Sequence, residues 1–149
     1  MNTIYLLSKS FIAENKIAES IKKTAINLNL QFFKNSRGYD VSVPDFGDLL
    51  EIYLSDHDDL QSDKEKELFK KDYGALLTIY YNNGGEEEDK VLIPFLNEFL
   101  KEYPEMLVYE DEINKKPFIY SKADFDAVND ISISTAFFKI PPKDPGLIS

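Results

Sequence analysis

One stretch of the sequence constrains the fold more than any other. Residues 75–81, Ala-Leu-Leu-Thr-Ile-Tyr-Tyr, are apolar, β-branched or aromatic at nearly every position. A strand with so little polar character has no solvent face and belongs in the middle of a sheet. Gly74 precedes the run and Asn82-Asn83-Gly84-Gly85 breaks it, as turn residues do at strand ends. The sequence therefore predicts a domain built around a sheet, with this strand at its centre.

Amphipathic helices are expected where apolar residues recur at spacings of three and four, or where a short stretch begins with a capping pattern. Asp89 is the expected N-cap of the clearest helix, and Pro94 predicts a bend or a late start in it. Ser121 with Asp124 is the expected capping pair of the last one. The expected helices span residues 17–28, 62–71, 92–103 and 121–128.

The remaining strands are expected from apolar runs and from polar–apolar alternation, at residues 4–7, 30–33, 39–43, 49–54, 106–109, 117–120 and 131–138. Laid end to end, the two halves of the chain share a β-α-β-β layout. The fold class predicted is α+β, with an antiparallel or mixed sheet and helices packed on one face. Two ferredoxin-like βαββ halves are one arrangement that fits. We expect a single domain over residues 1–140 and a proline-rich tail over residues 141–149.

The composition fits one ordinary intracellular domain. The chain has 149 residues, is 43% hydrophobic and contains no cysteine, so disulfides, thiolate nucleophiles and zinc fingers are excluded. The N-terminus lacks the basic and apolar regions of a signal peptide, and no apolar stretch is long enough to span a membrane. We expect a cytoplasmic protein.

The formal net charge is −10, and Arg37 is the single arginine. Such a chain repels phosphate groups, so nucleic acid and anionic membranes are poor partners. A basic protein is a better partner, because opposite charge steers association. The alternative is that the acidity serves only solubility.

The acidic residues gather at three predicted loops or helix starts. Exposed tyrosines among them would supply rigid contact area, and the candidates are Tyr53, Tyr80, Tyr81 and Tyr103. If the clusters converge, they would form a face that binds cations. The predicted partner-binding residues are Asp56, Asp58, Asp59, Glu86, Glu87, Glu88, Asp89, Glu110 and Asp111.

No catalytic or metal motif emerges. The loop at Asp56 fails the EF-hand pattern, because Gln61 stands where the turn requires glycine. The glycine-rich turn at Gly84 is followed by acids that would repel a phosphate. His57 is the single histidine and has no nucleophile to serve. We expect no catalytic residue, no metal site and no cofactor.

In size, acidity and α+β layout the chain resembles the bacterial toxin-immunity proteins. The resemblance implies a non-catalytic protein that neutralises a basic toxin by surface complementarity. Two alternatives stay open. One is a small-molecule-binding or regulatory domain of ferredoxin-like plan, for which a homodimer joined through sheet edges is expected. The other is an enzyme that uses carboxylates with or without Mg²⁺.

Overall fold

The structure is a computed structural model that describes residues 2–36, 38–42, 48–54, 74–81, 91–110, 118–127 and 137–143. Within these ranges the chain is an α+β protein with a seven-stranded sheet and three helices. The predicted helix at 62–71 and the acidic stretches at 56–59 and 86–89 lie outside the described residues.

Every neighbouring pair of strands in the sheet is antiparallel, so the antiparallel alternative is the one found. The strand order is β2-β3-β4-β5-β1-β6-β7. Strand β5 is therefore the central strand, as its continuous apolar sequence predicts. The strands are β1 (Asn2–Ser8), β2 (Gln31–Lys34), β3 (Gly38–Ser42), β4 (Asp48–Leu54), β5 (Gly74–Tyr81), β6 (Leu107–Glu110) and β7 (Phe118–Tyr120).

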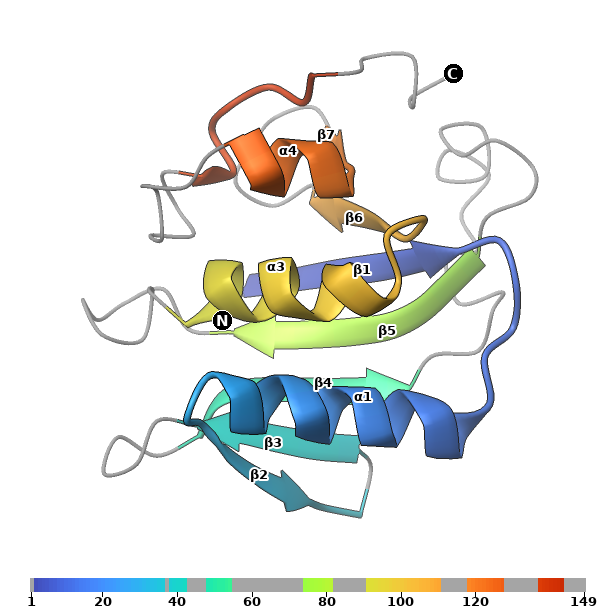
Figure 1. Cartoon of the computed structure of the whole chain (residues 1–149), viewed down its shortest axis with the longest axis vertical. Helices are drawn as coiled ribbons and strands as arrows, with labels where there is room; N and C mark the ends of the chain where they lie inside the picture. Colours follow the sequence, from blue (N-terminus) through green and yellow to red (C-terminus); the bar gives the residue numbers. More distant parts are fainter. Residues whose placement is uncertain are drawn as a thin grey trace.

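The helices are α1 (Glu14–Asn27), α3 (Leu92–Glu102) and α4 (Lys122–Ala127). All three lie on the same face of the sheet, with α3 between α1 and α4 (Figure 1). Their buried stripes meet the inward residues of the central strands, and Phe95 and Phe99 of α3 stack with ring centroids 6.1 Å apart in this core. The Tyr103 and Ser20 hydroxyls lie 2.9 Å apart and link α3 to α1. One face of the sheet is therefore sealed by helices.

Three boundaries differ from the sequence predictions. The N-cap of α3 is Val91 rather than Asp89, so the helix starts late and Pro94 falls in its first turn, where its missing N–H costs no helical bond. Glu110 extends β6 instead of opening a turn, because it pairs with Phe118. Phe137 and Phe138 form a helical turn rather than the end of a strand, since both rings pack into the core beside Tyr120.

The connections explain why the two halves of the sequence look alike. Each half runs from a central strand through a helix to a hairpin at one end of the sheet: β1, α1 and β2–β3 in the first half, and β5, α3 and β6–β7 in the second. Strand β4 inserts between β3 and β5, and the described residues of the second half contain no counterpart to it. The sheet is therefore one continuous structure rather than two separate four-element units.

Two buried polar side chains hold the C-terminal segment onto the fold. The Tyr120 hydroxyl lies 3.0 Å from the carbonyl oxygen of Phe138 and 2.8 Å from that of Ile140, and donates to them. The Asp124 carboxylate accepts from Ser121 N–H at 2.8 Å, which is the capping contact expected at the start of α4. Its other oxygen accepts from Lys143 N–H at 2.7 Å. The beginning of the predicted tail is thus fixed by the cap of α4.

Removing the Tyr120 hydroxyl should weaken the attachment of the C-terminal segment to the fold. We expect Tyr120→Phe to lower the free energy of unfolding by about 1–3 kcal/mol, because buried carbonyl groups lose a donor. Burial, followed by the nearby Glu110 and Asp124 charges, raises the pKa of Tyr120 above its usual 10.0. The folded protein therefore holds this proton more tightly than the unfolded chain, and that stability is lost as the pH rises above about 10.

Urea unfolding between roughly pH 8 and pH 11 tests this prediction. The wild-type protein should lose more stability than Tyr120→Phe over the alkaline part of the range. Tyr80→Phe, which removes a half-exposed tyrosine hydroxyl on another strand, is the control and should behave as the wild type. Parallel curves for Tyr120→Phe and the wild type would contradict the prediction.

Gly38 is required by a close approach between β3 and β4. A Cβ atom at this position would lie 2.0 Å from the carbonyl oxygen of Ile52 and 3.0 Å from the Tyr53 ring. Glycine alone lets the two strands meet here, and the Tyr53 ring occupies the space beside it. The position also anchors the preceding turn, because Gly38 N–H donates to the Asn35 side chain at 2.7 Å.

We expect Gly38→Ala to destabilise the protein by about 1–3 kcal/mol, because the backbone of β4 must shift to admit the methyl group. Chemical denaturation measures the change. Ser36→Ala, an exposed substitution in the same turn, should alter stability by less than about 0.5 kcal/mol. Equal stability of the two variants would show that the strands separate without cost.

Candidate functional site

Of the predicted partner-binding residues, the structure describes only Glu110. It lies at the end of β6, and its side chain is fully buried. Its side chain is therefore not exposed to a partner. The other eight, namely Asp56, Asp58, Asp59, Glu86, Glu87, Glu88, Asp89 and Asp111, lie outside the described residues.

The strands that precede two of the acidic stretches end at opposite ends of the sheet. Leu54, the last residue of β4, pairs with Leu77, whereas Tyr81, the last residue of β5, pairs with Asn2. The Asp56–Asp59 and Glu86–Asp89 stretches therefore join the sheet from opposite ends. The topology gives the two stretches no common point of attachment.

A different set of residues does share one surface, the face of the sheet opposite the three described helices. Antiparallel pairing aligns their side chains in two neighbouring rows that cross the strands. One row runs through Phe33, Asp40, Glu51, Tyr80 and Thr3, and the other through Tyr53, Thr78, Tyr5, Tyr109 and Ile119. We call the half-exposed members Thr3, Tyr5, Asp40, Glu51, Tyr53 and Tyr80 the tyrosine face.

The aromatic rings of this face are held against one another. Tyr53 and Tyr80 meet edge to face with centroids 5.4 Å apart, and Tyr5 packs against the buried ring of Tyr109 at 6.1 Å. Such pairs are favourable beyond the area they bury. Because they stand on central strands, these tyrosines offer a rigid surface with one apolar side and a hydroxyl. Of the four tyrosines proposed from the sequence, Tyr53 and Tyr80 lie here, Tyr81 is buried and Tyr103 is on the helical side.

Two carboxylates on the tyrosine face oppose each other directly. Asp40 and Glu51 are partners in the β3–β4 register, and like charges at such a position are destabilising. Glu51 accepts a hydrogen bond from the Tyr53 hydroxyl at 3.1 Å. Within the described residues, neither carboxylate forms an ion pair. The described residues therefore supply no ion-pair partner for the two negative charges on this face.

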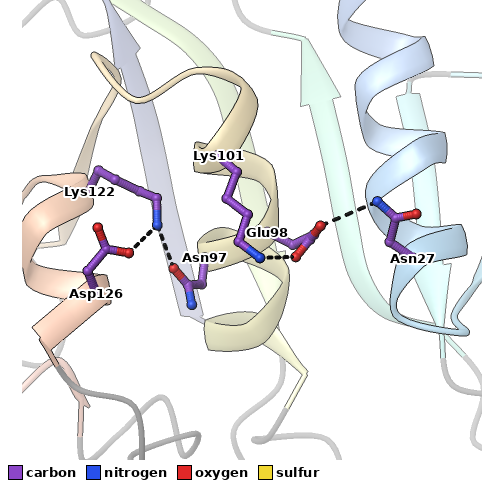
Figure 2. Close-up of polar contacts among 6 residues, drawn as sticks. All are labelled: Asn27, Asn97, Glu98, Lys101, Lys122 and Asp126. Atoms are coloured by element: carbon purple, nitrogen blue, oxygen red, sulfur yellow. Dashed lines mark hydrogen bonds and ion pairs between the residues drawn. The ribbon is translucent and has the colours of Figure 1, made fainter.

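On the outer surface of the helices, several charged side chains pair with neighbouring groups (Figure 2). Glu98 accepts from Lys101 at 2.9 Å and from Asn27 at 3.3 Å, which joins α3 to α1. The hydrogen bond from Lys101 holds the pKa of Glu98 below its usual value. Lys122 of α4 donates to Asn97 at 2.9 Å and pairs with Asp126. These groups bind one another and leave little free charge for a partner.

Two hollows among the described elements lie beside α1. One lies between α1 and α3, lined by Lys23, Thr24, Asn27, Glu98, Lys101 and Glu102. Another lies between α1 and the β2–β3 hairpin, lined by Glu14, Asn15, Ala18, Lys34 and Tyr39. In the described ranges, no three His, Cys, Asp or Glu side chains come close enough to hold a metal ion.

Three comparisons with known proteins found no match. No protein-family model matches the chain, and comparison with curated proteins and with solved structures found no match. No helix in the part of the chain that the structure describes combines the length and apolar character needed to cross a bilayer.

Sequence reasoning passed over Asp40, Glu51 and Tyr5, although the sequence contains a signal for them. Asp40 stands between two residues of the core, Tyr39 and Val41, and Glu51 stands likewise between Leu50 and Ile52. Period-two alternation therefore assigns both acids to the outer face of their strands. Their pairing depends on the β3–β4 register, which alternation alone does not set.

Neutralising one acid of the opposed pair should stabilise the fold. We expect Asp40→Asn to raise the free energy of unfolding by about 0.2–1 kcal/mol at low salt, with a smaller gain at high salt. Urea denaturation at two salt concentrations measures both values. Glu19→Gln is the matched control and should lower the free energy of unfolding. Glu19 has favourable neighbours of opposite charge, because Lys16, Lys22 and Lys23 lie within one helical turn. A loss of stability in Asp40→Asn would show that the carboxylate is held by favourable contacts.

Proposed function

We propose that this protein is a non-catalytic binding protein that uses the tyrosine face to hold a basic protein, as the bacterial toxin-immunity proteins hold their toxins. The observation that carries the proposal is the opposed Asp40–Glu51 pair on a rigid aromatic surface. An arrangement that costs folding stability is expected where a bound cation offsets the cost. A lysine or arginine placed between the two carboxylates would do so, and the flanking tyrosines would exclude water around it.

The distribution of charge supports a basic partner. The described helices and strands carry 10 acidic and 6 basic residues, and the rest of the sequence carries the other 17 and 11, so the larger part of the excess of acid belongs to the sequence segments between them. Those segments include the predicted contacts Asp56, Asp58, Asp59 and Glu86–Asp89. An excess of this size steers a cationic protein toward the domain at low ionic strength. A cytoplasmic location is part of the proposal and rests on the absence of cysteine.

Charge reversal on the face tests the proposal. Purification from the native host should recover a basic protein at low salt and lose it at high salt. Glu51→Lys should weaken binding to this purified partner at least about ten-fold, or about 1.4 kcal/mol, and should abolish inhibition of any activity the partner has. The folded state should not suffer, because the new lysine faces Asp40 across the strands.

Glu19→Lys makes the same change of charge on the helical surface and should bind as the wild type does. Equal loss of binding in both variants would show that net charge rather than the tyrosine face mediates the interaction. Recovery of a bound metabolite without a protein partner would contradict the proposal.

The topology favours one second candidate, a regulatory domain of ferredoxin-like plan that binds a small molecule. Its support is that each half of the chain passes from a central strand through a helix to an edge hairpin. The hollow between α1 and the β2–β3 hairpin, with Glu14 on one side and Lys34 on the other, is the matching site. Glu14→Gln would then weaken ligand binding without affecting association with a basic protein.

A further inference from the structure

Strand β2 forms one edge of the sheet, and an aromatic side chain is exposed on it. Among the described strands, β2 pairs only with β3. Phe33 is 53% exposed and lies opposite Asp40, beside the tyrosine face. Proteins usually guard such an edge with short strands and charges because its backbone can pair with another chain. An exposed phenylalanine on a sheet edge favours pairing instead.

The directions of the backbone groups of β2 follow from the turn into β3. Asn35 N–H donates to the carbonyl oxygen of Gly38 at 2.9 Å, so Asn35 faces β3. Antiparallel strands alternate between residues that bond to a given neighbour and residues that face away from it. Every second residue before Asn35 therefore also directs its backbone N–H and C=O groups toward β3, namely Phe33 and Gln31. The N–H and C=O groups of Phe32 and Lys34 therefore point outward, away from the sheet.

We propose that β2 pairs with β2 of a second copy of the chain, antiparallel and with Phe33 opposite its own counterpart. In this register Phe32 of each copy faces Lys34 of the other, and the four outward groups of each strand all find partners. Placing Phe32 opposite itself would instead set Lys34 against Leu30, whose N–H already donates to Ala25 at 2.8 Å. The strand is thus self-complementary in one register, as a two-fold interface requires.

The side chains agree with this register. The two Phe33 rings meet on the outer face of the sheet. On the helical face, Lys34 of each copy comes beside Phe32 of the other, and the Phe32 ring stacks on Tyr39 with centroids 5.4 Å apart. A cation beside aromatic rings is attracted to them. Glu14 lines the same hollow as Tyr39 and supplies the opposite charge. Lys34 therefore suits pairing with a second copy of this chain.

Pairing through β2 does not depend on the proposed function, because it uses the edge of the sheet and the side chains of β2. Its consequence for the assembly is geometric. Pairing through β2 would join two seven-stranded sheets edge to edge and bring the tyrosine faces of the two copies together on one side. The helices of both copies would lie on the other side.

Sedimentation of the wild-type chain over a range of concentrations should show a monomer–dimer equilibrium. Lys34→Pro removes one outward N–H while leaving the bonds to β3, and an edge strand tolerates proline, so we expect dimerisation to weaken at least ten-fold. Lys34→Gln keeps the N–H and should weaken it less. Circular dichroism confirms that both variants fold. A wild type that is monomeric at every concentration up to its solubility limit would overturn the proposal.

A second experiment tests the register and exploits the cysteine-free sequence. In a non-hydrogen-bonded antiparallel pair the Cα atoms lie about 4.5 Å apart, within the range that a disulfide spans. Phe33→Cys should therefore cross-link in a glutathione buffer. Gln31→Cys, exposed on the same strand, would lie about 13 Å from its counterpart and should stay unlinked. Equal cross-linking of the two variants, or of neither, would overturn the proposed register.

Discussion

The structure depends on the packing of all three described helices against one face of a single antiparallel sheet. The constraint starts with β5 and β1, whose inward residues Leu77, Ile79, Ile4 and Leu6 are fully buried and pair with each other across the centre. Helix α3 covers this pair, and α1 and α4 flank it. The three described helices supply the main core on this side, and the opposite side of the sheet carries polar and aromatic residues. The tyrosine face lies on that opposite side.

The same constraint separates the two surfaces electrostatically. On the helical side, residues three or four apart on one helix lie within reach of each other, so acids and lysines such as Glu98 and Lys101 of α3 pair on the surface. On the sheet side, partners are set by strand register, and the β3–β4 register opposes two acids. A helix can adjust its side-chain pairs by rotamer, whereas a register moves only as a whole. Among the described residues, two acids without an ion pair therefore lie side by side on the face of the sheet.

Much of the fold could be predicted from local sequence patterns. The apolar run at residues 75–81 indicates the central strand, the three-four spacing of α3 indicates its buried face, and Ser121 with Asp124 indicates the start of α4. The ends of helices and strands were harder to predict from the sequence where tertiary contacts decide them. Phe137 and Phe138 read as a strand because aromatic residues favour strands, but their packing against Tyr120 holds them in a helical turn. The candidate site could be predicted from the sequence only in part. Alternation assigns Tyr53 to an outer face, but its neighbours depend on pairing between distant segments.

The opposed carboxylates that lower the stability of the fold are the same groups to which we assign binding in the proposed function. Opposed carboxylates remain in a fold only while the rest of the structure outweighs their repulsion, and β3 and β4 are well placed to do so because their alternate residues, Val41, Leu50 and Ile52, are fully buried. A mobile loop would separate the two charges and lose the site. The rigid sheet keeps them together, so in the proposed complex a partner's cation would meet both carboxylates already in position, and little ordering would be needed on binding. The central packing of the sheet thus connects the hydrophobic core with the proposed function of the outer face.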